Sequence, residues 1–239
     1  MRHGLKIRND IPGYMAELRR WLQATEVDGL EEMAAFFSAR LDCYEDHMSR
    51  WQEAYRHMAS LVPPDARTLL DLGCGTGLEL DALLPLRPDL AVTGVDLSPD
   101  MLMRLRLKHP GVQTHCADYF AWELGQARYD AALTFETLHH FTPEKKAPLF
   151  SKIYAALHEG GIYLQADYFA CCAEEEALLY EVCRAKRLRD NIAPGQFVHF
   201  DTPLTLEHEM ALLRGAGFRR VEALCCVEGA CFLRAKKEG

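Results

Sequence analysis

The sequence has no apolar run approaching the roughly 18–20 residues that a membrane-spanning helix requires. Its first residues, MRHGLKIRND, are followed by no apolar segment of the kind found in secretory leaders. It also has no basic excess, because 27 Lys and Arg stand against 35 Asp and Glu and the formal net charge is −8. Since binding to nucleic acid or to an anionic membrane needs a basic footprint, we expect neither as a main function.

Cysteine and histidine spacing argue against two further kinds of site. The nine cysteines include no CxxC motif, and their odd number and two adjacent pairs, Cys171-Cys172 and Cys225-Cys226, do not indicate a disulfide framework or a zinc ribbon. Free cysteine is usually a small core residue, so we expect mostly buried thiols and a cytoplasmic location. Without HxH, HExxH or HxxxH spacing, we expect no functional metal.

The remaining composition is that of a globular protein, with 49% hydrophobic and 26% charged residues in a chain of 239. Its pattern changes near Pro63-Pro64. Before the prolines, apolar residues from Met33 to Met58 recur at steps of three and four, which predicts two or three helices over residues 12–60. A segment of about fifty residues makes a poor core alone. We therefore expect residues 1–60 to form a helical cap or lid on a domain over residues 61–239.

After the prolines, short apolar runs alternate with helical patterns. Strands are expected at residues 68–72, 91–96, 112–117, 129–134 and 162–167, followed by a hairpin over 218–225 and 230–235. Helices are expected at residues 78–86, 99–108, 145–158, 174–189 and 207–215. This alternation predicts an α/β fold with a doubly wound, mostly parallel sheet that has helices on both faces. Ligands of such sheets bind outside the carboxyl ends of the strands.

The sharpest motif is DLGCGTG, which runs from Asp71 to Gly77 between a predicted strand and a predicted helix. Glycines allow a tight turn and let a ligand touch the backbone, while the helix N-terminus offers free N–H groups to a phosphate or a carboxylate. The motif lacks the Lys-Ser/Thr ending of a phosphate loop. It also has Leu78 where the dinucleotide fingerprint needs its third glycine, which weakens the case for a dinucleotide.

Acidic residues follow two of the later strands. Asp96 comes 19 residues after the last glycine of the loop, where a carboxylate can accept hydrogen bonds from both hydroxyls of a ribose. Asp118 ends the next strand and could accept one from the exocyclic amine of adenine. A lone acid at a strand end is usually a cap or turn residue, but Asp71, Asp96 and Asp118 each end a separate strand. This order favours a nucleoside site.

Five segments, DLGCGTG, GVDLS, CADYF, YDAALTFETLHHF and LHEGGIYLQAD, occur in this order along the chain. With them, residues 60–236 resemble the class I S-adenosylmethionine-dependent methyltransferases, and look most similar to small-molecule methyltransferases of ubiquinone and menaquinone biosynthesis. The resemblance implies a seven-stranded sheet whose last strand is antiparallel. It also implies S-adenosyl-L-methionine as the cofactor.

The resemblance further implies which residues hold the cofactor. The glycine loop would hold the methionine part, with Asp71 facing its ammonium group, and Asp96 would hold the ribose. Over the cofactor we expect an aromatic side chain of the N-terminal segment, with Phe37 and Met48 as weaker candidates and Tyr44 preferred for its polar tip. The expected cofactor-binding residues are Tyr44, Asp71, Gly73, Gly75, Gly77, Asp96, Leu97, Met101, Asp118, Tyr119 and Phe135.

The acceptor is expected beside residues 135–141. Glu136 and His139 lie in this stretch, and His199 and Asp201 lie in a later loop that could fold over the strand ends. A general base is needed only if the acceptor must lose a proton. Packing or capping explains such residues at least as often as catalysis does. The candidates for the base, in falling order, are Glu136, His139 and His199.

We therefore expect a methyltransferase that acts on a small molecule, mainly by aligning cofactor and acceptor. One alternative is an RNA (tRNA) methyltransferase, although the most basic window, residues 184–189, reads as a solvated helix end rather than an anchor for RNA. The other is a non-catalytic or cofactor-modifying protein that binds S-adenosylmethionine. Neither the acceptor nor the choice between monomer and homodimer follows from the sequence.

Overall fold

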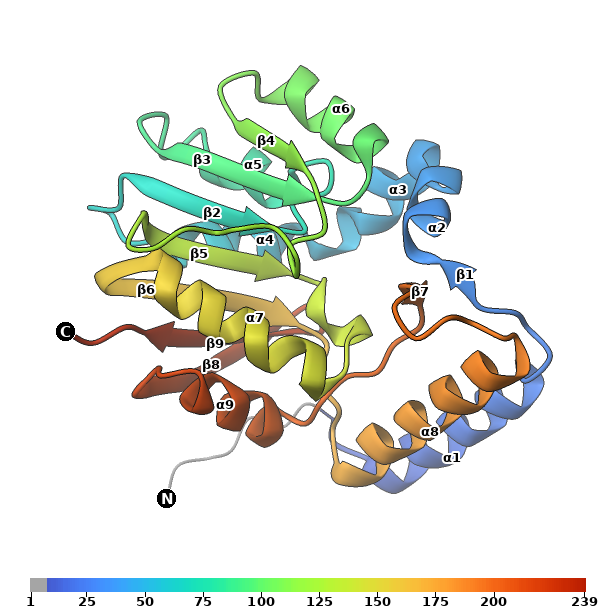
Figure 1. Cartoon of the computed structure of the whole chain (residues 1–239). Coiled ribbons are helices and arrows are strands. Elements are labelled where there is room, and N and C mark those ends of the chain that lie inside the picture. The colour runs from blue at the N-terminus through green and yellow to red at the C-terminus, as the bar shows by residue number, and fades with distance from the viewer. Residues whose placement is uncertain (1–7) are drawn as a thin grey trace.

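The computed structural model describes residues 8–239, and a seven-stranded sheet runs through its centre (Figure 1). The strands lie in the order β4-β3-β2-β5-β6-β9-β8, and β9 is antiparallel to both neighbours while the other pairs are parallel. This confirms the predicted doubly wound α/β fold. The strands are β2 (Thr68–Leu72), β3 (Ala91–Asp96), β4 (Gln113–Cys116), β5 (Tyr129–Phe135), β6 (Leu157–Asp167), β8 (Arg220–Val227) and β9 (Ala230–Lys236).

Helices cover both faces of the sheet, so its central strands are buried on both sides. In β2, Leu69 belongs to one core cluster and Leu70 to the other. This is why the sequence shows continuous apolar runs there instead of an alternating pattern. One face packs on α4 (Gln52–Leu61), α5 (Leu78–Leu83) and α6 (Pro99–Lys108). The other face packs on α7 (Pro143–Ala156) and α9 (Leu206–Gly215).

The N-terminal helices go to three different places (Figure 1). Helix α1 (Ile11–Ala24) lies beside α8 (Ala173–Arg189), where Met15, Leu18 and Leu22 pack on Leu179. Helices α2 (Met33–Ala39) and α3 (Leu41–Met48) lie near α6, and α4 covers the sheet. Together with the 3-10 turn η1 (Ser49–Trp51), this is more than the two or three helices expected. The division at residue 60 stays a prediction, and residues 1–7 of that cap lie outside the described part.

A short pairing connects the N-terminal segment to a late loop. Strand β1 (Glu31–Glu32) pairs antiparallel with β7 (Val198–His199). The carboxylate of Glu32 then accepts hydrogen bonds from the backbone N–H groups of Ala34 and Ala35 and caps α2. Within the described residues, no helix combines the length and the apolar character needed to cross a membrane.

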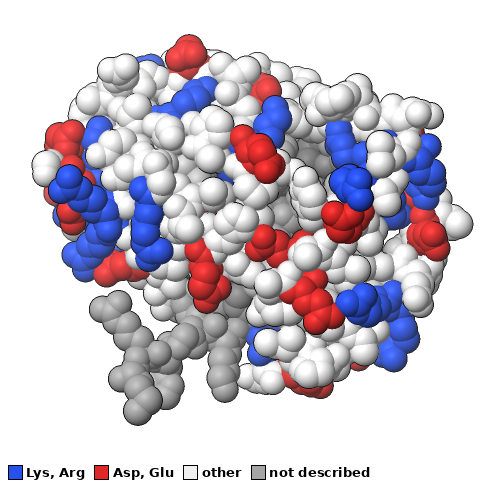
Figure 2. Space-filling model, turned by 60° about the horizontal axis from the view of Figure 1, so that its bottom comes forward, with Lys and Arg blue, Asp and Glu red and all other residues white. Residues whose placement is uncertain are grey.

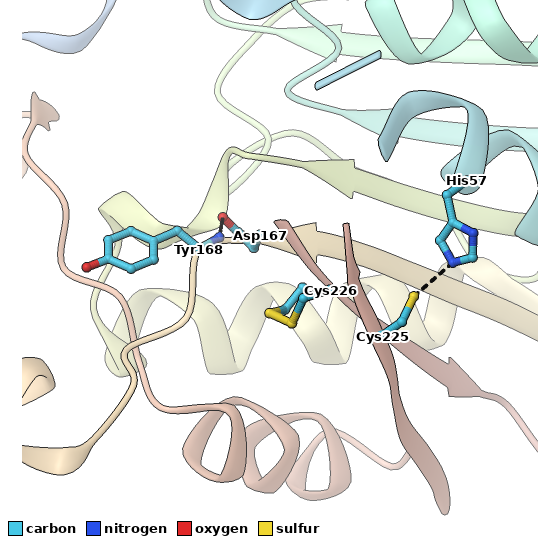
Figure 3. Close-up of a disulfide and its surroundings, with 6 residues drawn as sticks. His57, Asp167, Tyr168, Cys225 and Cys226 are labelled. Carbon is cyan, nitrogen blue, oxygen red and sulfur yellow. Dashed lines mark hydrogen bonds between the residues drawn. A yellow bond between two sulfur atoms is a disulfide. The ribbon is translucent and has the colours of Figure 1, made fainter. Parts of the chain in front are cut away.

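The cysteines differ in part from the sequence expectation of free thiols. Cys226 and Cys231 face each other across the β8–β9 hairpin and form a disulfide (Figure 3). The expectation was wrong for this pair because the hairpin register, which spacing alone does not give, brings the two residues together. The neighbouring Cys225 points elsewhere, and its Sγ lies 3.1 Å from Nε2 of His57. The expectation of mostly buried thiols was also wrong, because among the free cysteines that the structure describes Cys74 alone is buried, Cys43 and Cys116 are exposed, and the other four are partly exposed.

Candidate functional site

A cavity of about 1420 Å³ lies at the carboxyl ends of β2, β3 and β5. It exceeds the roughly 300–1,000 Å³ typical of a pocket for one ligand, so a second molecule would fit beside a cofactor. Asp71 and Gly77, both predicted cofactor residues, are not in its lining. The predicted site residues that line it are Tyr44, Gly73, Gly75, Asp96, Leu97, Met101, Asp118, Tyr119, Phe135, Glu136, His139 and His199.

The glycine loop connects β2 to α5 with a backbone that favours glycine. Gly73, Gly75 and Gly77 have φ angles of 75°, 49° and 78°, in the left-handed region. A side chain on Gly73 would also collide with Thr137, so the loop and the segment after β5 lie against each other. Gly77 instead faces Leu105 of α6 and caps α5, which makes its place structural. Gly73 and Gly75 thus present bare backbone to the cavity.

Asp96 ties this loop to the start of α6. Its two carboxylate oxygens accept hydrogen bonds from the N–H groups of Gly75, at 2.9 Å, and Ser98, at 2.8 Å. Burial raises the pKa of this carboxyl, although these backbone bonds oppose the rise. The Asp118 carboxylate is held in a similar way, by the N–H of Phe120 at 2.8 Å. Both acids therefore stand fixed at the cavity wall.

Asp71 lies fully buried beneath the loop. Neither of its carboxylate oxygens has a hydrogen-bond partner within the described part of the chain. Burial and the neighbouring charge of Glu79 raise its pKa well above the usual value, and burial raises the pKa of Glu79 to about 7. Buried polar groups are nearly always satisfied. The buried carboxyl groups of Asp71 and Glu79 therefore suit a cationic ligand above the loop.

The segment with Tyr44 covers the loop from the other side. A Cβ placed on Gly75 would lie 3.5 Å from the Tyr44 hydroxyl oxygen, so this hydroxyl points at the loop. Two bonds hold the segment to α6: Ser38 Oγ donates to Asp100 at 3.0 Å, and Arg104 donates to the carbonyl of Leu41 at 2.8 Å. That this segment acts as a lid stays a prediction.

A second cluster of polar side chains lies across the cavity, in the segment after β5. The side chain of His139 is buried, and its Nδ1 lies 2.5 Å from Oδ1 of Asp167. Burial lowers the pKa of His139, but the charges of Asp167, Asp201 and Glu136 outweigh burial and raise it to about 9. Glu136 has a strained φ of 49°, and burial raises its pKa to about 8. Glu136 therefore holds a proton at neutral pH.

His199 has a different environment from His139. Its ring stacks on Phe36 of α2 with centroids 3.5 Å apart and nearly parallel planes, and its backbone belongs to β7. Burial and the neighbouring His140 lower its pKa to about 4. His199 is therefore neutral at pH 7, and its stacking connects α2 to the late loop. His140 lies between His139 and His199, with ring centroids 3.9 Å and 4.8 Å away.

Comparisons with known proteins show to which family the chain belongs. Residues 69–161 match the model of a methyltransferase domain family. A carboxy-S-adenosyl-L-methionine synthase of Campylobacter concisus is 30% identical over 188 residues, which cover 70% of this chain and 75% of that protein. The chain belongs to the class I S-adenosylmethionine-dependent methyltransferases. A malonyl-[acyl-carrier protein] O-methyltransferase of Acetivibrio thermocellus is 27% identical over 158 residues, covering 65% of this chain and 55% of that protein.

A solved structure shows the same fold. Human N-acetylserotonin methyltransferase, in complex with S-adenosylmethionine, superposes with a TM-score of 0.65 at 19% identity, covering 95% of this chain and 66% of that one. Together with the family match and the curated relatives, this makes the methyltransferase described here an enzyme whose cofactor is S-adenosylmethionine. Its cavity fits that cofactor, because the bare backbone at Gly73 and Gly75 admits a close ligand. The buried carboxylate of Asp71 beneath the loop, which has no hydrogen-bond partner in the described part of the chain, suits the ammonium group of such a ligand.

Three site residues of the methyltransferase were missed by the sequence reasoning. Asp167 ends β6, so the strand-end signal that indicated Asp96 would also have found it. Tyr14 and Tyr168 line the cavity, and both hydroxyls bond to the buried carboxylate of Glu175, with Tyr14 at 2.5 Å. No local signal predicts that Tyr14 meets Tyr168 and Glu175, because Tyr14 in α1 is far from the other two in the sequence.

Proposed function

We propose that this enzyme transfers the methyl group of S-adenosylmethionine to a small-molecule acceptor bound beside His139. The supporting observation is one cavity with two unlike halves: the glycine loop with its carboxylates, and the polar group that includes His139 and Asp201. Bound S-adenosylmethionine supplies an activated methyl group and its own leaving group. The chain therefore has to align two ligands and exclude water.

In the cofactor half, Asp96 would accept hydrogen bonds from the ribose hydroxyls and Asp118 from the adenine amine. Leu97, Met101, Tyr119 and Phe135 would surround the adenine and the adjoining ribose. Tyr44 would cover the methionine part, and Asp71 would face the ammonium group, directly or through water. These assignments accord with the lining of the cavity, although Asp71 acts from beneath the loop.

In the acceptor half, His139 would hold and orient the nucleophilic atom, because Asp167 fixes its ring at the cavity wall. Glu136 would donate a hydrogen bond instead of acting as a base, since its pKa of about 8 keeps it protonated at neutral pH. Aromatic side chains form much of the remaining wall, which favours a largely apolar acceptor. They are Phe36, Phe37, Trp51, Phe120, Phe141, Phe197 and Phe200.

The test is a search for product that assumes no acceptor. The enzyme is incubated with S-adenosylmethionine carrying a labelled methyl group and with fractions of a metabolite extract, and the label is traced by mass spectrometry. We expect a labelled small molecule together with S-adenosylhomocysteine, and binding of S-adenosylhomocysteine at roughly micromolar Kd, near −8 kcal/mol. Absence of binding at millimolar ligand, in calorimetry and in thermal shift, would contradict the proposal.

A second candidate is modification of the cofactor itself. It is favoured by the relatives named carboxy-S-adenosyl-L-methionine synthase. Mass spectrometry of the ligand that copurifies with the protein separates the two functions. A carboxylated cofactor supports the second candidate, whereas S-adenosylmethionine or its demethylated product supports methyl transfer.

RNA is the less favoured acceptor, because the most basic window is engaged within the fold. Lys186 is buried and donates to the carbonyls of Thr25, at 2.6 Å, and Asp28, at 2.9 Å, just after α1. Arg189 also donates to the carbonyl of Asp28, and Arg187 to that of Ala193. On the face in Figure 2, acidic and basic side chains are mixed without a continuous basic stripe. A salt-sensitive shift on a tRNA gel would reverse this preference.

A further inference from the structure

A compact group of nitrogen and oxygen donors stands on the acceptor side of the cavity. One donor atom from each of His139, His140 and Asp201 lies within 4.8 Å of the other two. All three residues line the cavity, with His139 buried and the other two partly exposed. The donors come from η2 (Leu138–His140), directly after β5, and from the loop after β7. They therefore meet only in the folded chain.

Two of the three distances within this group suit ligands that share an ion, and Nδ1 of His140 also lies 3.4 Å from the carbonyl oxygen of Phe200. Oδ1 of Asp201 lies 3.6 Å from Nε2 of His139 and 3.2 Å from Nδ1 of His140. The first distance is too long for a hydrogen bond and the second is at the long limit. Two ligands held about 2.1 Å from a zinc ion at a tetrahedral angle lie about 3.4 Å apart. The two observed distances fall on either side of this value.

Asp167 supplies the support that a metal-binding histidine usually has. Its Oδ1 faces Nδ1 of His139, and its Oδ2 accepts from the N–H of Leu138 at 3.0 Å and from the amide of Gln165 at 3.3 Å. The N–H of Tyr168 donates to Oδ1 at 3.0 Å, as Figure 3 shows. A carboxylate that fixes one ring nitrogen leaves the other free to bind a metal. In His139 this other nitrogen, Nε2, faces Asp201.

We propose that His139, His140 and Asp201 form a site for a divalent transition-metal ion, which we take to be Zn²⁺, with Asp167 orienting His139. Imidazole nitrogens suit Zn²⁺ and similar ions, whereas Mg²⁺ and Ca²⁺ prefer oxygen ligands. Three protein ligands leave a position open toward the cavity, where an oxygen atom of the acceptor would bind. This last step rests on the proposed function, and ion binding does not.

The test uses the full chain after removal of metal by a chelator. Zn²⁺ is titrated in competition with a chromophoric chelator, and Co²⁺ replaces it so that visible absorption reports the ligands. We expect one ion per chain at micromolar Kd or tighter, without a sulfur-to-cobalt charge-transfer band. His140→Ala and Asp201→Asn should weaken binding at least tenfold, and Asp167→Asn by about 10–100-fold. His208→Ala should bind like the wild type, because His208 pairs with Glu176 elsewhere.

Circular dichroism and thermal unfolding of each variant separate loss of the site from loss of the fold, and the isosteric Asp201→Asn is the variant least disturbing to packing. The proposal is overturned if the wild-type chain binds no ion at micromolar concentration. It is also overturned if both Asp201→Asn and His140→Ala bind Zn²⁺ normally, because other residues then hold the ion. If the ion binds as expected and no methyl transfer is found, the proposed function fails and the metal site stands. Methyl transfer unaffected by chelation overturns acceptor binding to the ion.

Discussion

The contribution of Asp96 to cofactor binding can be separated from its contribution to the loop. Its carboxylate accepts two backbone N–H groups in the structure, and we propose that it also accepts the ribose hydroxyls. Hydrogen bonds to a charged group contribute about 1.5–3 kcal/mol. Asp96→Ala should therefore weaken S-adenosylhomocysteine binding by about 10–150-fold in calorimetry.

A matched control is available at the amino end of β5, opposite the carboxyl ends where the cavity lies. The Asp130 carboxylate also accepts two backbone N–H groups, those of Arg67 at 2.8 Å and Thr68 at 3.0 Å. Asp130→Ala thus removes the same kind of structural bonds far from the cavity. It should lower the free energy of unfolding and leave the Kd for S-adenosylhomocysteine unchanged.

The decisive comparison uses an S-adenosylhomocysteine analogue that lacks both ribose hydroxyls. The wild-type enzyme should bind this analogue more weakly than the parent ligand, whereas Asp96→Ala should bind the two almost equally, because the interaction is already lost. If removing the hydroxyls costs the same affinity in both proteins, Asp96 only orders the loop and its proposed contact with ribose is refuted.

Three other predictions concern charge, lid and stability. Burial raises the pKa of Glu79 to about 7, so its carboxyl loses a proton as the pH rises through about 7, and the affinity for the cationic cofactor should rise over the same range. Calorimetry of Glu79→Gln should show a flatter dependence of this affinity on pH. An unchanged slope would exclude Glu79 as its cause. Tyr44→Ala should weaken cofactor binding severalfold more than Tyr44→Phe. Bound cofactor should also slow the hydrogen exchange of backbone amides over residues 37–48. Equal exchange with and without cofactor would argue against a lid. Lys146→Met should lower the free energy of unfolding in urea by about 3–5 kcal/mol, because it leaves the buried carboxylate of Glu209 without its ion-pair partner. Adding Glu209→Leu should restore most of the lost stability. A double variant as unstable as the single one would contradict this.

Local patterns determined much of the fold. The strands at residues 68–72 and 91–96 have the predicted bounds, because the sequence of a buried parallel strand is a short apolar run between turn residues. The glycine loop was equally predictable, since left-handed backbone favours glycine whatever surrounds it. The apolar stripe before residue 60 was harder to interpret. Its period indicated helices, but it did not show that Arg40 and residues 49–51 interrupt them or that α1 packs on α8.

By itself, the sequence thus determined the α/β fold and the segments that lie at the carboxyl ends of the strands, because both depend on short-range periodicity and backbone freedom. Only the tertiary structure decided which side chains meet there. The pairing of His139 with Asp167 and the approach of Asp201 to His140 join segments separated by long stretches of chain. The raised pKa values of His139 and Glu136 follow from that meeting, since burial and neighbouring charges are properties of the packed interior.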